Sequence, residues 1–296
     1  MSGELKPVED RRLVAIALMI GAFFCFMGID TCAKWLVTRG MPVTEAVFVR
    51  YLGHFLLVLA ISGPALGMSL ARSKAPAITI ARAFALMIST AFNFAALQYL
   101  PLSLTMSIFF AAPLIVCALS IPVLGETVGW RRWAAIGVGF AGVLIVVRPG
   151  LGDVHWAAIF SIGAVTCASI YFVLTRKAAG RDTTEVQQFY AAGLATLCLA
   201  PFAAPVWQWP VGIDWLAFVL IGLFGWLGHQ LLIIGHRFAP ASVLAPFVYL
   251  QLIFMVASGW IFFADIPDIW VMIGAAVVMA SGLYIWLRER QLSESS

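Results

Sequence analysis

Residues 44–50, TEAVFVR, open one long apolar run, and residues 184–190, TEVQQFY, open a second run in the later half of the chain. Further short matches occur in the same order in both halves: Ile20-Gly21-Ala22 with Ile162-Gly163-Ala164, Lys34 with Arg176, Pro101 with Pro240, Ser103 with Ser242, and Glu126 with Asp265. The chain therefore contains one unit twice.

Composition places both units in a membrane. Hydrophobic residues make up 62% of the chain and charged residues 11%, whereas soluble domains average roughly 45–50% and 25%. A helix needs about 20 apolar residues to cross the hydrocarbon core. Breaks in hydropathy delimit ten such runs, at 13–35, 43–63, 77–99, 101–123, 130–148, 154–175, 185–205, 213–236, 240–263 and 267–287. We therefore predict an all-α integral membrane protein with ten transmembrane helices.

Five helices per unit imply an inverted repeat, because an odd number makes the second unit enter the bilayer from the opposite side. We expect a cytoplasmic N-terminal tail at 1–12, one five-helix repeat at 13–148, a second at 153–287, and a cytoplasmic C-terminal tail at 288–296. The first apolar run follows Arg11 and Arg12 and lacks a small-residue cleavage site, so we expect a retained helix rather than a signal peptide.

The distribution of positive charge orients the chain. Most lysines and arginines outside the apolar runs, and Arg82, are assigned to the side of the N-terminus, and the opposite side receives only Lys34, Arg39 and Arg148. This asymmetry predicts that both termini are cytoplasmic. The net charge of +4 therefore reflects topology, and no nucleic acid partner is expected.

Several motifs resemble one transporter family. In the first half they are PLSL at 101–104, LGE at 124–126 and GVGFAG at 137–142; in the second half they are Pro240 with Ser242, Tyr249 to Gln251, and Ala264 with Asp265. Together they resemble the EamA family of the drug/metabolite transporter superfamily over nearly the whole chain. Ala264 and Asp265 replace the usual Gly and Glu. The resemblance implies transport of amino acids, S-adenosylmethionine, riboflavin or other vitamins, or nucleobase-like compounds across an inner membrane.

The glycine-rich run at 137–142 matches a nucleotide-binding pattern only superficially. A dinucleotide fingerprint requires a preceding strand and a helix that starts at the loop, whereas these glycines lie inside a continuous apolar run. Close packing of neighbouring helices explains them better. Pro113 and Pro246 also lie within apolar runs, where the missing amide donor predicts a kink.

Ionisable residues inside the membrane are functional candidates because burying a charge is costly. Asp30 and Lys34 share one face of the first helix, and we expect them to neutralise one another as a gate. Arg50 either binds an anionic group of the substrate or is neutralised within the protein. Asp30, His54 and His229 are candidates for proton coupling, and for the two histidines the alternative is a neutral structural role.

Uncharged polar residues supply the remaining candidates for a substrate site. Asn93, Tyr171, Tyr249, Trp226 and Gln251 interrupt apolar runs and can line one central cavity. Phe92, Phe94 and Trp260 are expected to add flat apolar walls, since small-molecule sites combine aromatic lining with few polar groups.

These observations predict a secondary transporter of a small organic metabolite that works by rocking of two inverted repeats. Its expected partners are the small molecule and the lipid bilayer, and the sequence leaves open whether the chain forms a homodimer. The alternatives are a sensor or structural protein without transport, or a membrane-embedded enzyme. The sequence carries no HExxH, GxSxG or Walker-type motif, so we expect neither enzymatic activity nor a cofactor. The cysteines and histidines lack the spacing of a metal site.

Overall fold

The computed structural model describes residues 12–124, 130–147, 155–178, 180–238, 244, 247 and 250–294. Within these ranges every regular element is helical. The elements are α1 (Arg12–Thr38), α2 (Val43–Leu66), η1 (Gly67–Ala71), α3 (Pro76–Leu97), α4 (Leu102–Phe109), α5 (Ala112–Leu124), α6 (Trp130–Val147), α7 (Ala158–Lys177), α8 (Thr184–Ala203), η2 (Ala204–Val206), α9 (Asp214–Phe238), α11 (Leu250–Phe263) and α12 (Ile269–Glu294). The prediction of an all-α protein is confirmed for this part of the chain.

Seven of the described segments are long and apolar enough to cross a membrane: Leu13–Thr38, Val43–Ala71, Pro76–Leu97, Leu102–Val123, Ala158–Thr175, Thr184–Val206 and Asp214–Gly235. Three shorter apolar helices accompany them, at Trp133–Val146, Leu250–Phe263 and Ile269–Tyr284. Large apolar side chains such as Leu197, Val219 and Ile253 are exposed by 72%, 61% and 61% on the outside of the bundle. Such a surface suits lipid as its solvent, as a membrane protein requires.

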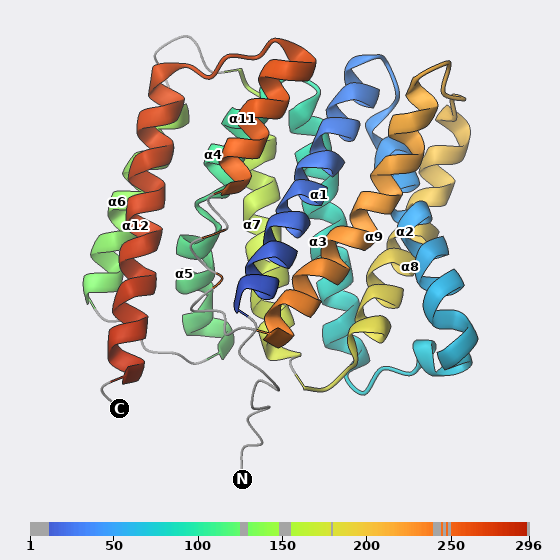
Figure 1. Cartoon of the computed structure of the whole chain (residues 1–296), viewed down its shortest axis with the longest axis horizontal. Coiled ribbons are helices and arrows are strands. Elements are labelled where there is room, and N and C mark those ends of the chain that lie inside the picture. The colour runs from blue at the N-terminus through green and yellow to red at the C-terminus, as the bar shows by residue number, and fades with distance from the viewer. Residues whose placement is uncertain are drawn as a thin grey trace.

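The helices form one bundle and run roughly side by side along it (Figure 1). The pair α6 and α12 lies at one edge of the bundle and the pair α2 and α8 at the other, with the remaining helices between them. We call the end at which α1 begins the near end, and the end at which α1 finishes, at Thr38, the far end. The connection from α2 to α3 lies at the near end, and that from α1 to α2 at the far end.

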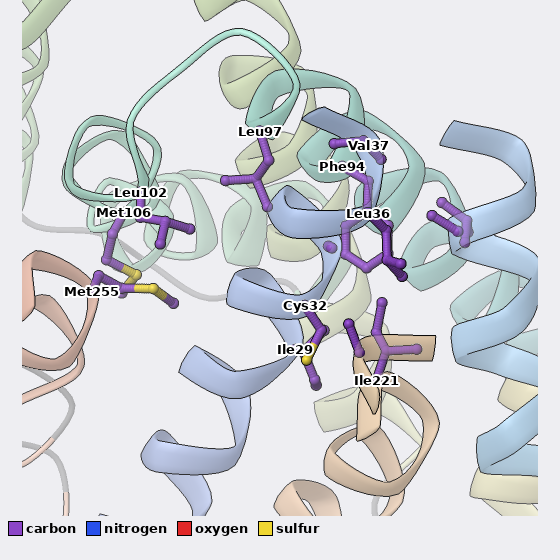
Figure 2. Packing of buried hydrophobic residues seen from close by; sticks show 14 of the residues in the cluster. Ile29, Cys32, Leu36, Val37, Phe94, Leu97, Leu102, Met106, Ile221 and Met255 are labelled. Carbon is purple, nitrogen blue, oxygen red and sulfur yellow. The ribbon is translucent and has the colours of Figure 1, made fainter. Parts of the chain in front are cut away.

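A hydrophobic core joins the two halves of the chain (Figure 2). Met106 of α4 and Met255 of α11 lie side by side, and Ile221 of α9 lies beside Ile29 and Cys32 of α1. Three of the cysteines, Cys25, Cys32 and Cys117, are buried and fill space within the bundle. Burial of this core therefore depends on contact between residues that are far apart in the sequence.

Glycines permit the closest helix contacts. A Cβ added to Gly53 of α2 would lie 2.9 Å from the Cα of Gly222 on α9. Gly142 of α6 is equally close to α12, since an added Cβ would lie 3.0 Å from the carbonyl oxygen of Gly274. The glycine-rich run at 137–142 therefore packs a helix, as predicted, although Gly137 itself faces open space.

The fourth apolar run is divided. Phe110 and Ala111 form a turn between α4 and α5, and Pro113 is the second residue of α5. Because proline has no amide hydrogen, the α-helical bond to the carbonyl of Phe109 cannot form. The predicted kink at Pro113 is confirmed, whereas Pro246 lies outside the described residues.

We predict that Gly53→Ala destabilises the protein and that Gly63→Ala does not. The new methyl group at position 53 would overlap the backbone of α9, whereas nothing lies within 4 Å of a Cβ at Gly63 on the same helix. Overpacking of this kind costs about 1–3 kcal/mol. Thermal unfolding in mild detergent measures the difference, and equal midpoints for the two variants would contradict the close contact between α2 and α9.

Candidate functional site

The first part of the candidate site joins α1, α2 and α3 through polar side chains. The Nδ2 of Asn93 donates to the Oδ1 of Asp30 at 2.8 Å. One turn earlier on α3, the Oγ1 of Thr90 lies 2.9 Å from the hydroxyl oxygen of Tyr51. The guanidinium carbon of Arg50 lies 4.5 Å from the centre of the Tyr51 ring. Arg50, Asp30 and Asn93, all predicted from the sequence, thus belong to one cluster.

The second part joins α2, α8 and α9. The Nε2 of His54 lies 3.5 Å from the Oε1 of Gln188, which also accepts from the Nε2 of Gln230 at 3.4 Å. The rings of His54 and His229 stack with their centres 5.8 Å apart, and Phe26 of α1 packs edge-on against His229 at 5.3 Å. The structure therefore brings the two predicted histidines together, and it adds Gln188, which the sequence analysis did not single out.

Arg82 is a site residue that the sequence analysis misplaced. It was assigned to the positive charges outside the membrane, yet it lies in the second turn of α3 and is only 6% exposed. Its Nη2 donates to the hydroxyl oxygen of Tyr171 at 3.0 Å, and its Nε donates to the Oγ1 of Thr175 at 2.7 Å. Arg82 lies inside the predicted transmembrane span 77–99. Its position in that span was the signal in the sequence that the side chain is buried. Tyr171, a predicted site residue, therefore binds a second buried arginine.

The remaining predicted lining residues have different fates. Trp226 follows Gly225, whose added Cβ would lie 3.9 Å from the Cγ of Arg50, so this part of α9 lies against the cluster. Gln251, in the first turn of α11, makes no hydrogen bond with the cluster residues, and Tyr249 lies outside the described residues. Trp260 is 66% exposed, so its predicted role as a cavity wall is wrong. A tryptophan on an apolar membrane helix can face either the interior of the bundle or the lipid, because both environments are apolar. The sequence alone therefore does not distinguish the two orientations.

Lys34 pairs with a residue that the sequence analysis did not assign to it. Its Nζ donates to the Oδ2 of Asp265 at 2.6 Å and to the carbonyl oxygen of Leu100 at 2.9 Å. The predicted pair of Asp30 with Lys34 is therefore wrong, because Asp30 binds Asn93 and Lys34 reaches across to the end of α11. Helical spacing places two side chains on one face, but the neighbouring helices offer each of them a better placed partner.

The ion pair of Lys34 belongs to a larger set of contacts at the far end. Asp214, at the start of α9, lies 2.8 Å from the Nε of Arg39 and accepts from the Nε1 of Trp35 at 2.8 Å. The Oε2 of Glu45 accepts from the backbone amide of Gln208 at 3.0 Å. Each contact joins the first half of the chain to the second. We call these contacts, with Lys34–Asp265, the far-end latch.

A second set of contacts joins the halves at the near end, and we call it the near-end latch. Asp182, between α7 and α8, accepts from the hydroxyl of Ser73, from the amide of Lys74 at 2.6 Å and from the hydroxyl of Thr79 at 2.8 Å. The hydroxyl of Tyr190 on α8 donates to the carbonyl oxygen of Ala71 at 2.8 Å. The polar cluster thus lies between two layers of contacts that cross from one half to the other.

Comparison with known proteins identifies the family of the chain. The sequence model of the EamA-like transporter family matches residues 13–148 and 155–287. The chain belongs to the EamA-like transporter family. A riboflavin transporter of Rhizobium johnstonii is 27% identical over 95% of this chain and 94% of its own. An S-adenosylmethionine uptake transporter of Rickettsia bellii is 24% identical over 88% and 89%.

Two further likenesses extend the comparison. A pseudopaline exporter of Pseudomonas aeruginosa is 23% identical over 93% of this chain and 96% of its own. One solved crystal structure superposes with a TM-score of 0.59 at 19% identity, covering 92% of this chain and 98% of that chain. This structural likeness supports the fold. The expected resemblance to the EamA family is thereby confirmed, and the relatives differ in the compound that they carry.

We predict that Asp265→Asn destabilises the protein more than the double change Lys34→Gln with Asp265→Asn. The single change leaves the ammonium of Lys34 buried without its counter-charge, and removal of one partner of a buried pair costs about 3 kcal/mol or more. The double variant holds no unpaired charge. Thermal unfolding in detergent compares the variants, and a double variant less stable than Asp265→Asn alone would contradict this ion pair.

We also predict that acid opens the near-end latch. Burial alone would raise the pKa of Asp182, but hydrogen bonds from Ser73, Lys74 and Thr79 and the charge of Lys74 hold this pKa below its ordinary value. A carboxyl group with a lowered pKa stabilises the folded state fully above the ordinary value of about 3.9, and this contribution is lost as the pH falls through the lowered pKa. Thermal midpoints measured from about pH 6 to pH 3 should converge for the wild type and Asp182→Asn. A constant difference between them would contradict this role.

Proposed function

We propose that the chain is a secondary transporter that moves a small organic metabolite across an inner membrane by alternating access. Ten helices, with α4 and α5 counted as one segment, would form two inverted five-helix repeats with both termini in the cytoplasm. The observation that carries the proposal is the polar cluster around Arg50, which lies between two latches that both join the first half of the chain to the second.

The pattern of helix packing supports a two-fold relation between the halves. If α1, α2, α3, α4–α5 and α6 correspond to α7, α8, α9, α11 and α12, exchanging the halves leaves the main contacts unchanged. The pair α1–α9 becomes α7–α3, and both pairs pack closely. The pairs α2–α8 and α6–α12 map onto themselves, and both lie at the edges of the bundle (Figure 1). The match of one family model to each half agrees with this correspondence.

The direction of the helices supports inversion. His155, just before α7, stacks on Tyr99, just after α3, with ring centres 5.1 Å apart. At the opposite end, Asp182 after α7 binds Thr79 in the first turn of α3. Helix α7 therefore runs antiparallel to α3. Since α1 and α3 both run from the near end to the far end, α1 and its counterpart α7 point in opposite directions, as an inverted repeat requires.

The two latches suggest how access alternates. Opening of the far-end latch would separate Lys34 from Asp265 and expose the cluster to one side of the membrane. Opening of the near-end latch would release Asp182 from Ser73 and Thr79 and expose it to the other side. Bound substrate would lower the free energy of switching by satisfying cluster groups that otherwise lack partners. A rocking motion of two similar halves around a midplane site is the usual form of this mechanism.

The substrate belongs to the class of small metabolites. The relatives include proteins named for riboflavin, S-adenosylmethionine and pseudopaline. These compounds are all small organic molecules, and they differ in charge. The class is therefore supported by the family, and the choice within the class must come from the residues of the cluster.

Counterflow in sealed vesicles tests the proposal. Purified protein is reconstituted into proteoliposomes loaded with an unlabelled compound, and uptake of the labelled compound is followed for S-adenosylmethionine, riboflavin, amino acids and nucleosides. We expect saturable uptake of one class, accelerated by the same compound inside. A sensor or structural protein would give no uptake of any compound, and a channel would give uptake without acceleration or saturation.

A further inference from the structure

The buried polar atoms without partners are mostly hydrogen-bond donors. In the described part of the chain they include the Nε and Nη1 of Arg50, the Nη1 of Arg82, the Nε2 of Gln188 and the Nε1 of Trp226. The unpartnered oxygens are one atom each of Glu45 and Ser161, and the Nδ1 of His54 completes the set. A buried donor that stays unpaired destabilises the protein because it has lost its hydrogen bonds to water. The unmet donors therefore indicate that the protein accommodates acceptor atoms from another molecule.

These donors surround one region of the bundle. Gly225 of α9 lies against both His54 and Arg50, since its added Cβ would be 3.8 Å from the Nδ1 of one and 3.9 Å from the Cγ of the other. Trp226 is the next residue of that helix. Gln188 shares hydrogen bonds with His54, and His229, stacked on His54, lies within the electrostatic reach of both Arg50 and Arg82. Residues with unpartnered donors on α2, α3, α8 and α9 thus lie around the pair of His54 and His229.

The charges around this centre do not balance. Arg50 and Arg82, which are 5% and 6% exposed, bring two positive charges, and the carboxylate near them is Asp30. Asp30 interacts electrostatically with Arg50 but forms its hydrogen bond with Asn93, and within the described part of the chain Arg50 forms no ion pair. One buried positive charge is left without a counter-charge, which is costly inside a membrane. A single anionic group from a ligand would restore the balance.

Arg50 has the geometry of a ligand-binding side chain rather than of a structural one. Its guanidinium rests on the Tyr51 ring, and the hydroxyl of that ring is fixed by Thr90. This support holds the guanidinium plane in place, and its Nε and Nη1 have no hydrogen-bond partner. By contrast, Arg82 uses Nε and Nη2 on Thr175 and Tyr171. A planar guanidinium with free donors matches a carboxylate through two parallel hydrogen bonds.

We propose that the transported metabolite carries a carboxylate, and that Arg50 binds it, with Gln188 and Trp226 donating to further acceptor atoms of the same molecule. This inference rests on the proposed transport function and narrows its substrate class to small organic acids, including zwitterionic amino acids and their derivatives such as S-adenosylmethionine. An uncharged compound such as riboflavin would leave the guanidinium without a counter-charge. A phosphate monoester would bring more negative charge than the site leaves uncompensated.

The test compares acids with their neutral carboxamides. Amino acids, S-adenosylmethionine, riboflavin and nucleotide monophosphates are first measured as labelled substrates in the reconstituted wild type. The acid that is transported is then compared with its carboxamide as a competitor. We expect the carboxamide to compete about 10- to 100-fold more weakly, as the loss of a charged hydrogen-bonded pair implies.

Arg50→Gln supplies the decisive variant. It should lower the affinity of the acid as a competitor by a similar factor and leave the affinity of the carboxamide unchanged. The two compounds should then compete equally well. Arg50→Lys keeps the charge and should retain part of the preference. Arg72→Gln removes the same type of charge from an exposed position outside the cluster and should leave the preference intact. A variant that merely folds poorly would lose both compounds together.

The outcomes separate this inference from the proposed function. Transport of riboflavin or another uncharged compound, with an affinity that Arg50→Gln does not alter, would contradict the proposed carboxylate substrate. The proposed transport function would still hold. Equal weakening of acid and carboxamide by Arg50→Gln would also overturn it, by assigning Arg50 a structural role. A preference for a phosphate monoester would mean that the site recognises a different anion. It would contradict the proposed class of carboxylate substrates. Absence of transport for every compound would overturn the proposed function itself.

Discussion

The hydrocarbon core of the membrane constrains every polar group in this chain. No water is available there, so each backbone donor and acceptor must be satisfied within a helix, and each charged side chain must find a partner inside the protein. The chain accordingly has long apolar helices and few charged side chains. Several of these charged side chains form ion pairs or hydrogen bonds between the two halves. Lys34 with Asp265, Arg39 with Asp214 and Asp182 with Ser73 each cross from one half to the other.

The same constraint separates the ends of the bundle from its middle. At both ends ion pairs and hydrogen bonds join the two halves, and these contacts stabilise an arrangement in which the halves are closed on each other. In the middle, Arg50, Gln188 and Trp226 keep donors without acceptors. A protein that only needed stability would fill this region with apolar side chains, since replacing buried charges by packed apolar groups is often neutral or stabilising. The unmet donors are therefore better explained by a ligand than by folding.

Sequence patterns were sufficient for the all-helical class and for most members of the polar cluster that forms the candidate site. Apolar runs predicted the helices, and the cost of burying charge selected Asp30, Arg50 and His54 because such residues are rare in apolar runs. Patterns along one helix did not predict partners across helices. Asp265 binds Lys34, and Asn93 binds Asp30, through packing that brings together residues 231 and 63 positions apart. Arg82 was missed because a charge near a helix end was assigned to the membrane surface, whereas α3 places it inside the bundle.

The balance between the latches and the centre also sets the energetics of transport. Opening either latch removes ion pairs and hydrogen bonds between the halves, and closing it restores them, so the empty protein gains stability from both latches at once. A ligand that satisfies Arg50 adds free energy only where the cluster encloses it. If that gain is larger in the intermediate with both latches closed than in either open state, binding lowers the barrier to switching, since a ligand shifts an equilibrium only by its differential affinity for the states. Under that condition the unpaired guanidinium at the centre would couple recognition of the substrate to movement of the two halves.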